Sequence, residues 1–299
     1  MTARRRSVLP VLAGLLTAGL AVTACGAQHG PASAAGATAN IAADSGAAGA
    51  AGGTSTTAGS ASPAAAGSDS GPGQAAAATP LAGKVIGIDP GHNGHNKDFP
   101  ARLAKQVWNG RAWEDCDTTG TESSSGYTEA RFTFNVAGYL RADLRKAGAK
   151  VVMTRYDNHG FGPCVNTRSK ILNRAHAKVS IDIHGDGGPA SGRGFTVLEP
   201  IADGPNNKVI KSSDRFGADV HSALLKHTSM PISNYYGHNG YIKRDDLAGL
   251  NLTTEPKILI ECGNMRNSAD AHLMRQPWFQ KRLAKAFTSA IVWFETHRK

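Results

Sequence analysis

The stretch KVIGIDPGHNG, residues 84–94, decides how the chain folds. A short apolar run ends at Asp89, a Pro-Gly turn follows, and His92 comes directly after the turn. An apolar run bounded by turn residues is typical of a buried strand. His92 therefore lies just beyond a strand, at the end where α/β proteins place their sites.

Four further apolar runs have the length and composition of strands. We interpret all five as continuous rather than alternating, which favours strands covered on both faces. Helical patterns lie between them, so the sequence predicts an α/β fold, a single domain with a mainly parallel or mixed central sheet covered by helices on both faces. The four further runs are KVVMTR (150–155), KVSIDIH (178–184), GFTVLE (194–199) and KILIE (257–261).

The expected helices have recognisable ends. We expect Thr128 to cap the first helix and Gly148 to end it. Ser213 is the expected cap of the third helix, and Pro277 falls in the first turn of the last. The apolar residues that predict these helices fall within 132–144, 171–175, 216–224 and 279–294.

Two histidines and two glutamates gather on one edge of the predicted sheet. His92 follows the first strand and Glu129 begins the next helix. His184 and Glu261 end two other strands, and the carboxyl ends of parallel strands share one edge. Two imidazoles and one carboxylate form a three-ligand zinc set with a fourth position open, and a further carboxylate can accept a proton. His95 is a weaker alternative ligand.

Each of the four residues also has an ordinary structural interpretation. A histidine after a strand is usually a satisfied polar group, and a glutamate at a helix start complements the helix dipole. His184 could form a simple ion pair. Glu261 follows a buried strand, where an unpaired carboxylate is costly, so it already requires a partner. Their convergence on one edge favours the metal site.

The first 80 residues divide into an export signal and a linker. Residues 1–25 have three arginines, an apolar stretch and small residues up to Cys25, as in a signal peptide. The stretch VTAC (22–25) resembles the lipobox of bacterial lipoproteins, and cleavage after Ala24 without lipidation is the alternative. Residues 26–80 are Ala, Gly, Ser, Thr or Pro at all but seven positions, which predicts a disordered linker. Residues 81–299 then form the catalytic domain.

The net charge indicates which classes of binding partner suit the domain. The formal net charge is +10 and residues 1–80 contribute +1 of it, so the domain is basic. Acidic cell-wall polymers and anionic lipid suit that charge. Nucleic acid is not expected, because no nucleic-acid-binding motif occurs.

Cys116 and Cys164 fall in polar loops at the same sheet edge, which predicts a disulfide. Cys262 follows an apolar run and is expected to be a buried free thiol.

Four motifs in order resemble the zinc-dependent N-acetylmuramoyl-L-alanine amidases of the amidase_3 family. The similarity covers nearly all of residues 84–299. It implies zinc ligands His92, Glu129 and His184, with Glu261 as the catalytic carboxylate. Asp182 stands where a serine is more usual, and we expect it to support His184. The motifs are IDPGHNG (88–94), YTEARFTFNVAGYLRADLRKAGAKVVMTR (127–155), TRSKILNRAHAKVSIDIHGD (167–186) and ILIECGNMRN (258–267).

The resemblance implies a peptidoglycan hydrolase that uses zinc-activated water. The bond cleaved would be the amide between N-acetylmuramic acid and the L-alanine of the stem peptide. A zinc peptidase that cuts a stem-peptide bond, or an inactive cell-wall-binding regulator, are the alternatives. We expect an exported protein of the cell envelope or extracellular space, with Cys25 as a candidate lipid anchor. A monomer is expected, although the sequence leaves the oligomeric state open.

Overall fold

A mixed sheet organises the protein. The computed structural model describes residues 79–297, so the predicted signal peptide and lipobox, and all of the predicted linker except its last two residues, lie outside the described part. The six strands have the order β4-β1-β5-β8-β6-β7. The first four run parallel, whereas β6 is antiparallel to β8 and parallel to β7. The strands are β1 (Val85–Pro90), β4 (Lys150–Met153), β5 (Val179–Asp186), β6 (Thr196–Pro200), β7 (Tyr241–Arg244) and β8 (Lys257–Asn264).

The five predicted strands are all present, and the mixed sheet agrees with the predicted fold class. The short strand β7 was not predicted, and the strands that carry His184 and Glu261 continue two or three residues beyond their expected ends. Four of the strands thus bring their carboxyl ends to one edge, as the topology argument requires.

The interpretation of the strands as continuous apolar runs is wrong in one respect. Residues of β5 alternate, with Val179, Ile181 and Ile183 on one face and Ser180, Asp182 and His184 on the other. The same alternation places isoleucines of β1 and β8 on the first face, and Asp89, Lys257 and Glu261 on the second. The sheet is therefore covered on both faces, but one face is apolar and the other carries a buried row of polar side chains.

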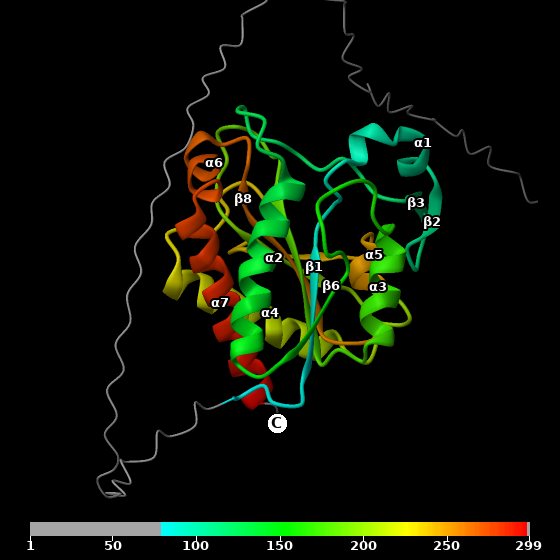
Figure 1. The fold of residues 1–299 in the computed structure, drawn as a ribbon, viewed down its shortest axis with the longest axis vertical. Helices are drawn as coiled ribbons and strands as arrows, with labels where there is room; N and C mark the ends of the chain where they lie inside the picture. The colour runs from blue at the N-terminus through cyan, green and yellow to red at the C-terminus, as the bar shows by residue number, and fades with distance from the viewer. Residues whose placement is uncertain (1–78, 298–299) are drawn as a thin grey trace, which may run out of the picture. The chain divides into compact units, whose positions relative to one another are not determined.

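Helices cover the two faces unequally (Figure 1). The long helices α2 (Glu129–Lys146), α4 (Ile210–His227) and α7 (Pro277–Thr296) lie on the apolar face. The shorter α3 (Val165–Arg174) and α5 (Ala248–Asn251) lie on the polar face. Each apolar side chain that is fully buried contributes about 1.5–3 kcal/mol, so the α2, α4 and α7 layer supplies most of the stability.

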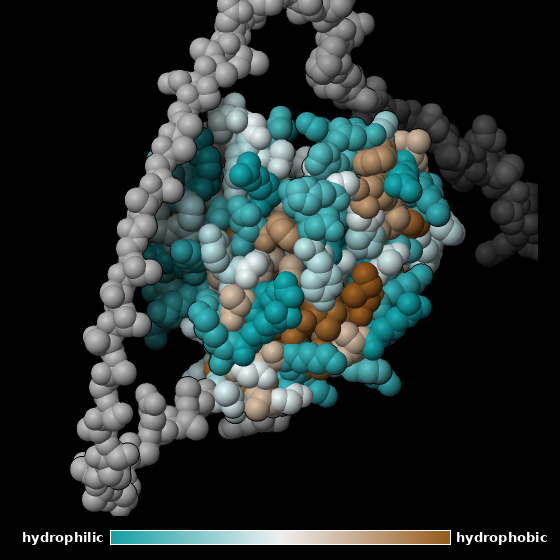
Figure 2. Space-filling view, in the orientation of Figure 1, coloured by the Kyte–Doolittle hydropathy of each residue, from teal (hydrophilic) through white to brown (hydrophobic). Residues whose placement is uncertain are grey.

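The face of the molecule seen in this view is mostly polar. Figure 2 shows it largely hydrophilic, with hydrophobic areas reaching the surface beside α3 and over the region of α1. No helix among residues 79–297 is long and apolar enough to cross a membrane.

Two of the expected helix caps differ in the structure. Thr128 holds the N-cap position of α2, but its side chain makes no capping hydrogen bond. Ser213 does not cap α4, because that helix begins three residues earlier at Ile210; instead its hydroxyl is buried and accepts from the backbone N–H of Lys257. Gly148 ends α2 with a φ of 92°, and α7 begins at Pro277 as predicted.

The long connection from β1 to α2 has structure of its own. It contains the 3-10 turn Asn96–Asp98, α1 (Pro100–Leu103), β2 (Gln106–Trp108) and β3 (Trp113–Asp115), with β2 and β3 paired antiparallel. A further short helix, α6 (Ser268–Met274), precedes α7. The predicted Cys116–Cys164 disulfide is present and ties this connection to the start of α3. Cys262 is buried and free, as predicted.

We expect the disulfide to stabilise the folded protein. Its two cysteines are 48 residues apart, and closing a loop of that length contributes about 4 kcal/mol at most on the chain-entropy model. Denaturant titration with and without reductant measures the loss. The matched control is the double variant Cys116→Ser with Cys164→Ser, whose stability should not respond to reductant. Peptide mapping that finds both thiols free in protein purified without reductant would contradict the prediction.

Candidate metal centre and active site

His92 is held in position by the turn that follows β1. Its φ of 57° lies in the left-handed region, which is unusual for a residue with a side chain. The Arg168 guanidinium donates to the His92 carbonyl at 2.7 Å and fixes this conformation. Gly91 precedes it, and a Cβ there would lie 2.4 Å from Cε1 of His184. Only glycine therefore lets the two imidazoles approach each other.

Glu129 is positioned by backbone donors on both of its oxygens. The N–H of Thr121 donates to Oε2 at 2.9 Å, and the N–H of Gly185 donates to Oε1 at 3.1 Å. A second arginine, Arg155, aligns α2 with the turn after β1, because its guanidinium donates to the carbonyls of Pro90, Gly91 and Ala130. The carboxylate consequently points at both histidines.

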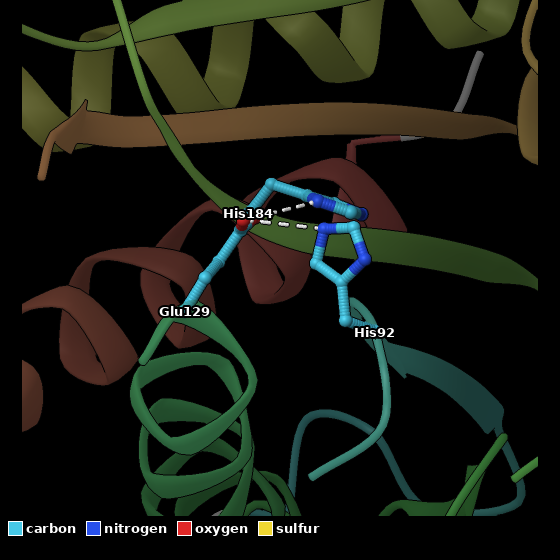
Figure 3. A group of neighbouring side chains, drawn as sticks. All are labelled: His92, Glu129 and His184. Carbon is cyan, nitrogen blue, oxygen red and sulfur yellow. Dashed lines mark hydrogen bonds and ion pairs between the residues drawn. The ribbon is translucent and has the colours of Figure 1, made fainter. Parts of the chain in front are cut away.

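The structure brings the three predicted metal ligands together (Figure 3). One ligand atom from each of His92, Glu129 and His184 lies within 4.8 Å of the others. Nε2 of His92 is 3.2 Å from Oε2 of Glu129, and Nδ1 of His184 is 2.9 Å from Oε1. His95 is not part of this group: its exposed ring contacts Asp98 instead.

The electrostatics of the group favour positive charge between these side chains. Burial lowers the pKa of His92, but the Glu129 charge and the Asp117 hydrogen bond outweigh burial and raise that pKa to about 9. Burial acts in the same way on His184, and the charge of Asp182 raises its pKa well above the usual range. The pKa of Glu129 is held well below its ordinary value, because the histidines outweigh the effect of burial. These side chains therefore favour positive charge between them. A divalent cation bound there, in place of the protons on the two imidazoles, supplies that charge.

Glu261 lies beside this group on the neighbouring strand. It pairs in register with His184 across β5 and β8, so both side chains share the polar face of the sheet. Its Oε2 is buried and has no hydrogen-bond partner among residues 79–297. Burial raises the pKa of Glu261 to about 8, and the nearby carboxylates of Glu129 and Asp186 add to this effect. A buried carboxylate without a partner is costly, which is typical of a functional group.

A buried ion network supports His184. Nζ of Lys257 is fully buried and lies 2.9 Å from Oδ2 of Asp89 and 3.5 Å from Oδ2 of Asp182. The other oxygen of Asp182 lies 3.2 Å from Nε2 of His184. The expected contact between Asp182 and His184 is thus present. It leaves Nδ1 of the imidazole directed at Glu129.

The same network reaches His92 from the other side of Asp89. The Arg168 guanidinium donates to Oδ1 of Asp89 at 2.9 Å and lies 3.6 Å from Oδ2 of Asp117. Asp117 in turn contacts Nδ1 of His92 at 3.0 Å. Burial raises the pKa of Asp89, but the charges of Lys257 and Arg168 outweigh burial and hold that pKa well below its ordinary value. Asp89 is therefore ionised and links the supports of both histidines.

No role in this network was predicted for four of its members: Asp89, Arg168, Lys257 and Asp117. Lys257 begins the apolar run KILIE, where a lysine suggests a strand end facing solvent, yet it is fully buried. Asp117 lies far from His92 in sequence, and only its position next to Cys116 could have indicated that it reaches the sheet edge. Their contacts depend on tertiary structure that local pattern does not encode.

The group opens into a cavity of about 700 Å³. Its lining includes His92, Glu129, His184 and Glu261, and the hairpin residues Glu114 and Asp115. Eight carboxylates and two guanidinium groups line the cavity, which contrasts with the net charge of +10 for the whole chain. This local excess of negative charge favours a bound cation.

Comparisons with known proteins agree with this geometry. Residues 86–292 match the family described as N-acetylmuramoyl-L-alanine amidase. N-acetylmuramoyl-L-alanine amidase Rv3717 of Mycobacterium tuberculosis is 38% identical over 229 residues, which are 74% of this chain and 90% of that protein. The crystal structure of the amidase Ami1 from Mycobacterium smegmatis has a TM-score of 0.69 at 35% identity, covering 73% of this chain and 99% of that one. Ami1 from Mycobacterium abscessus has a TM-score of 0.67 at 36% identity, covering 72% and 99%. The chain therefore belongs to the N-acetylmuramoyl-L-alanine amidase family.

Proposed function

We propose that the chain hydrolyses the amide bond between N-acetylmuramic acid and the L-alanine of the stem peptide, with a zinc ion held by His92, Glu129 and His184. The observation that carries the proposal is the convergence of these three ligand atoms, within 4.8 Å of one another, beside the unpartnered carboxylate of Glu261. The names of the relatives support the same reaction and peptidoglycan as the substrate.

The donor set suits zinc better than the common hard cations. Two imidazole nitrogens and one carboxylate oxygen are typical of catalytic zinc sites, whereas magnesium and calcium prefer oxygen ligands throughout. Three protein ligands leave one coordination position open. When bound, zinc supplies an electrophilic centre that polarises a carbonyl and makes water more acidic.

The residues of the chain supply the remaining chemistry. In this proposal Glu261 accepts the proton of the attacking water; its position next to His184 in the strand register, and an Oε2 without a hydrogen-bond partner in the described part of the chain, support that role. It then donates that proton to the L-alanine nitrogen, which leaves poorly unless it is protonated. A pKa raised by burial suits both steps, since the group must accept and then release a proton.

The alternatives make different predictions. A zinc peptidase with the same ligands would release fragments cut within the stem peptide, whereas the amidase releases a stem peptide with a free L-alanine amine. An inactive regulator is disfavoured because all four site residues are in place. Mass spectrometry of the products from purified peptidoglycan distinguishes the amidase, the zinc peptidase and the inactive regulator. Export, lipidation of Cys25 and a monomeric state stay predictions.

Zinc retention should depend on the three ligands. We expect His92→Ala and His184→Ala each to lose most of the bound metal, because two ligands hold zinc far less tightly than three. Metal content by atomic spectroscopy, with circular dichroism to confirm folding, is the measurement. His95→Ala serves as the matched control and should keep its metal, because that exposed histidine contacts Asp98. Full zinc occupancy in folded His184→Ala would overturn the ligand assignment.

Glu261 should be needed for the reaction but not for zinc. Glu261→Gln keeps the size of the side chain and removes the base, so we expect normal zinc content and a rate lower by about 100-fold or more. Zinc content, melting temperature and peptidoglycan cleavage should be measured on one preparation. If the residue only supports the fold, the variant will instead lose stability and keep its activity per folded molecule. A stable, zinc-loaded and fully active variant would refute the mechanism.

Asp182 should tune the affinity for zinc through His184. Asp182→Ser removes the carboxylate that contacts Nε2, and loss of such a partner typically weakens metal binding by about 10- to 100-fold. Lys257→Met should destabilise the fold by about 3–5 kcal/mol, because it removes a buried cation that lies close to both Asp89 and Asp182 and leaves their charges only partly compensated. Chelator competition measures the zinc affinity of Asp182→Ser, and denaturant titration measures the free energy of unfolding of Lys257→Met.

The exposed pair of Asp214 and Lys243 provides the control for Asp182. Asp214→Ser makes the same substitution in an ion pair with Lys243 at the surface. Neither zinc affinity nor stability should change by much, because exposed ion pairs contribute little. The double variant of Asp182 and Lys257 should lose less stability than the sum of the single variants, because the two side chains interact. Unchanged zinc affinity in Asp182→Ser would show that His184 needs no such support.

A further inference from the structure

The hairpin of β2 and β3 presents an aromatic face to solvent. Its register pairs Trp108 with Trp113 and Gln106 with Asp115, and these four side chains share one face of the two-stranded sheet. The opposite face carries Val107 and Glu114, which turn toward the body of the protein. The hairpin therefore keeps its aliphatic residue inside and its two tryptophans outside.

The exposure of these tryptophans is unusual for their size. Trp108 is 43% exposed and Trp113 is 67% exposed, and their ring centroids are 5.8 Å apart in an edge-to-face arrangement. Large aromatic side chains usually contribute to the core, and adjacent exposed ones mark an interaction surface. The outer face of the hairpin thus offers an aromatic platform, with Gln106 and Asp115 as its polar neighbours.

The hairpin is held rigidly enough to act as a binding surface. The disulfide at Cys116 follows β3 directly. Arg111, in the turn, pairs with Asp245. Oδ1 of Asn109 accepts from two backbone N–H groups of the turn, while its Nδ2 donates to the carbonyl of Asp246. A surface ordered in advance loses little conformational entropy when it binds a ligand.

The hairpin that carries the platform borders the cavity. Asp115, which shares the outer face with Trp113, and Glu114, on the opposite face, both line the cavity, and Asp117 contacts His92. The four residue steps from Trp113 to Asp117 span at most about 14 Å of chain. A sugar chain whose muramic acid lies at His92 can therefore reach the tryptophans within a few rings.

We propose that the aromatic platform binds the glycan strand of peptidoglycan next to the muramic acid whose amide is cleaved. This inference rests on the proposed function. The faces of sugar rings carry C–H groups, which pack against the electron-rich face of an aromatic ring, and hydroxyl and acetamido groups bond to side chains such as Gln106 and Asp115. A carboxylate on this face opposes an anionic lipid surface as the occupant.

Peptide-free glycan strands provide a direct test, because they contain no amide that the enzyme cleaves. Binding is measured by titration calorimetry with the zinc-loaded protein. We expect Trp113→Ala and Trp108→Ala each to weaken binding by about 10-fold or more, and Trp113→Phe to keep most of it. Trp278→Ala and Trp293→Ala are matched controls on α7, 48% and 56% exposed, and should bind normally.

Kinetics separate this inference from the proposed function. On a single N-acetylmuramoyl dipeptide, which lacks neighbouring sugars, the platform variants should keep their turnover number and KM. On polymeric peptidoglycan their KM should rise about 10-fold, in line with the lost binding. A protein that binds the glycan but leaves the dipeptide intact refutes the proposed activity and leaves the platform standing.

Three outcomes would overturn the platform. The first is Trp113→Ala binding peptide-free glycan as tightly as the unaltered protein. The second is an equal loss in Trp278→Ala, which would mean that any exposed tryptophan contributes. The third is unaltered glycan binding together with a loss of binding to anionic phospholipid vesicles in the Trp113 variants, which would assign the face to a membrane instead.

Discussion

The buried charge of Asp89 is the constraint on which the rest of the site depends. Moving an ion out of water costs several kcal/mol, and only close partners recover that cost. Asp89 has two, Lys257 from β8 and Arg168 from α3, so its burial requires β1, β8 and α3 to meet at fixed separations. From the same pair of cations, contacts lead through Asp182 to His184 and through Asp117 to His92. This one network therefore links the packing of β1, β8 and α3 to the geometry of the candidate metal ligands.

The two faces of the sheet have different roles: one packs the hydrophobic core, and the other carries the candidate site. On the apolar face, α2, α4 and α7 bury aliphatic and aromatic side chains in one continuous core. On the polar face, the central strands contribute these residues to the network or to the cavity: Asp89, Asp182, His184, Lys257, Leu259 and Glu261. Because side chains of a strand alternate, a one-residue slip in β5 would exchange His184 for an isoleucine. The hydrophobic core thus fixes the register that the site requires.

The parts that sequence could predict are those governed by local pattern. Apolar runs and helical spacing gave the main strands and long helices, and parallel topology placed the four site residues on one edge. The strand β7 was missed because its residues, YIKR, are mostly half-exposed and carry no apolar run. Lys257 and Asp117 were missed because their roles arise from neighbours distant in sequence. In VSIDIH, Val179, Ile181 and Ile183 alternate with polar residues, so the pattern of the sequence itself indicates one apolar and one polar face, and the interpretation as a continuous apolar run was wrong.

The net charge of the whole chain and the charge of the cavity lining have opposite signs. The chain is strongly basic, a net charge that suits association with acidic polymers. The cavity is acidic, with carboxylates well in excess of guanidinium groups. In physiological salt, exposed charges are screened beyond about 8 Å, so the basic exterior has little influence on the buried ligands. Inside, low polarity strengthens each contact: both histidines contact Glu129, and each has a second carboxylate, Asp117 for His92 and Asp182 for His184. The protein can therefore be drawn to a polyanion as a whole while its centre keeps a strong preference for a cation.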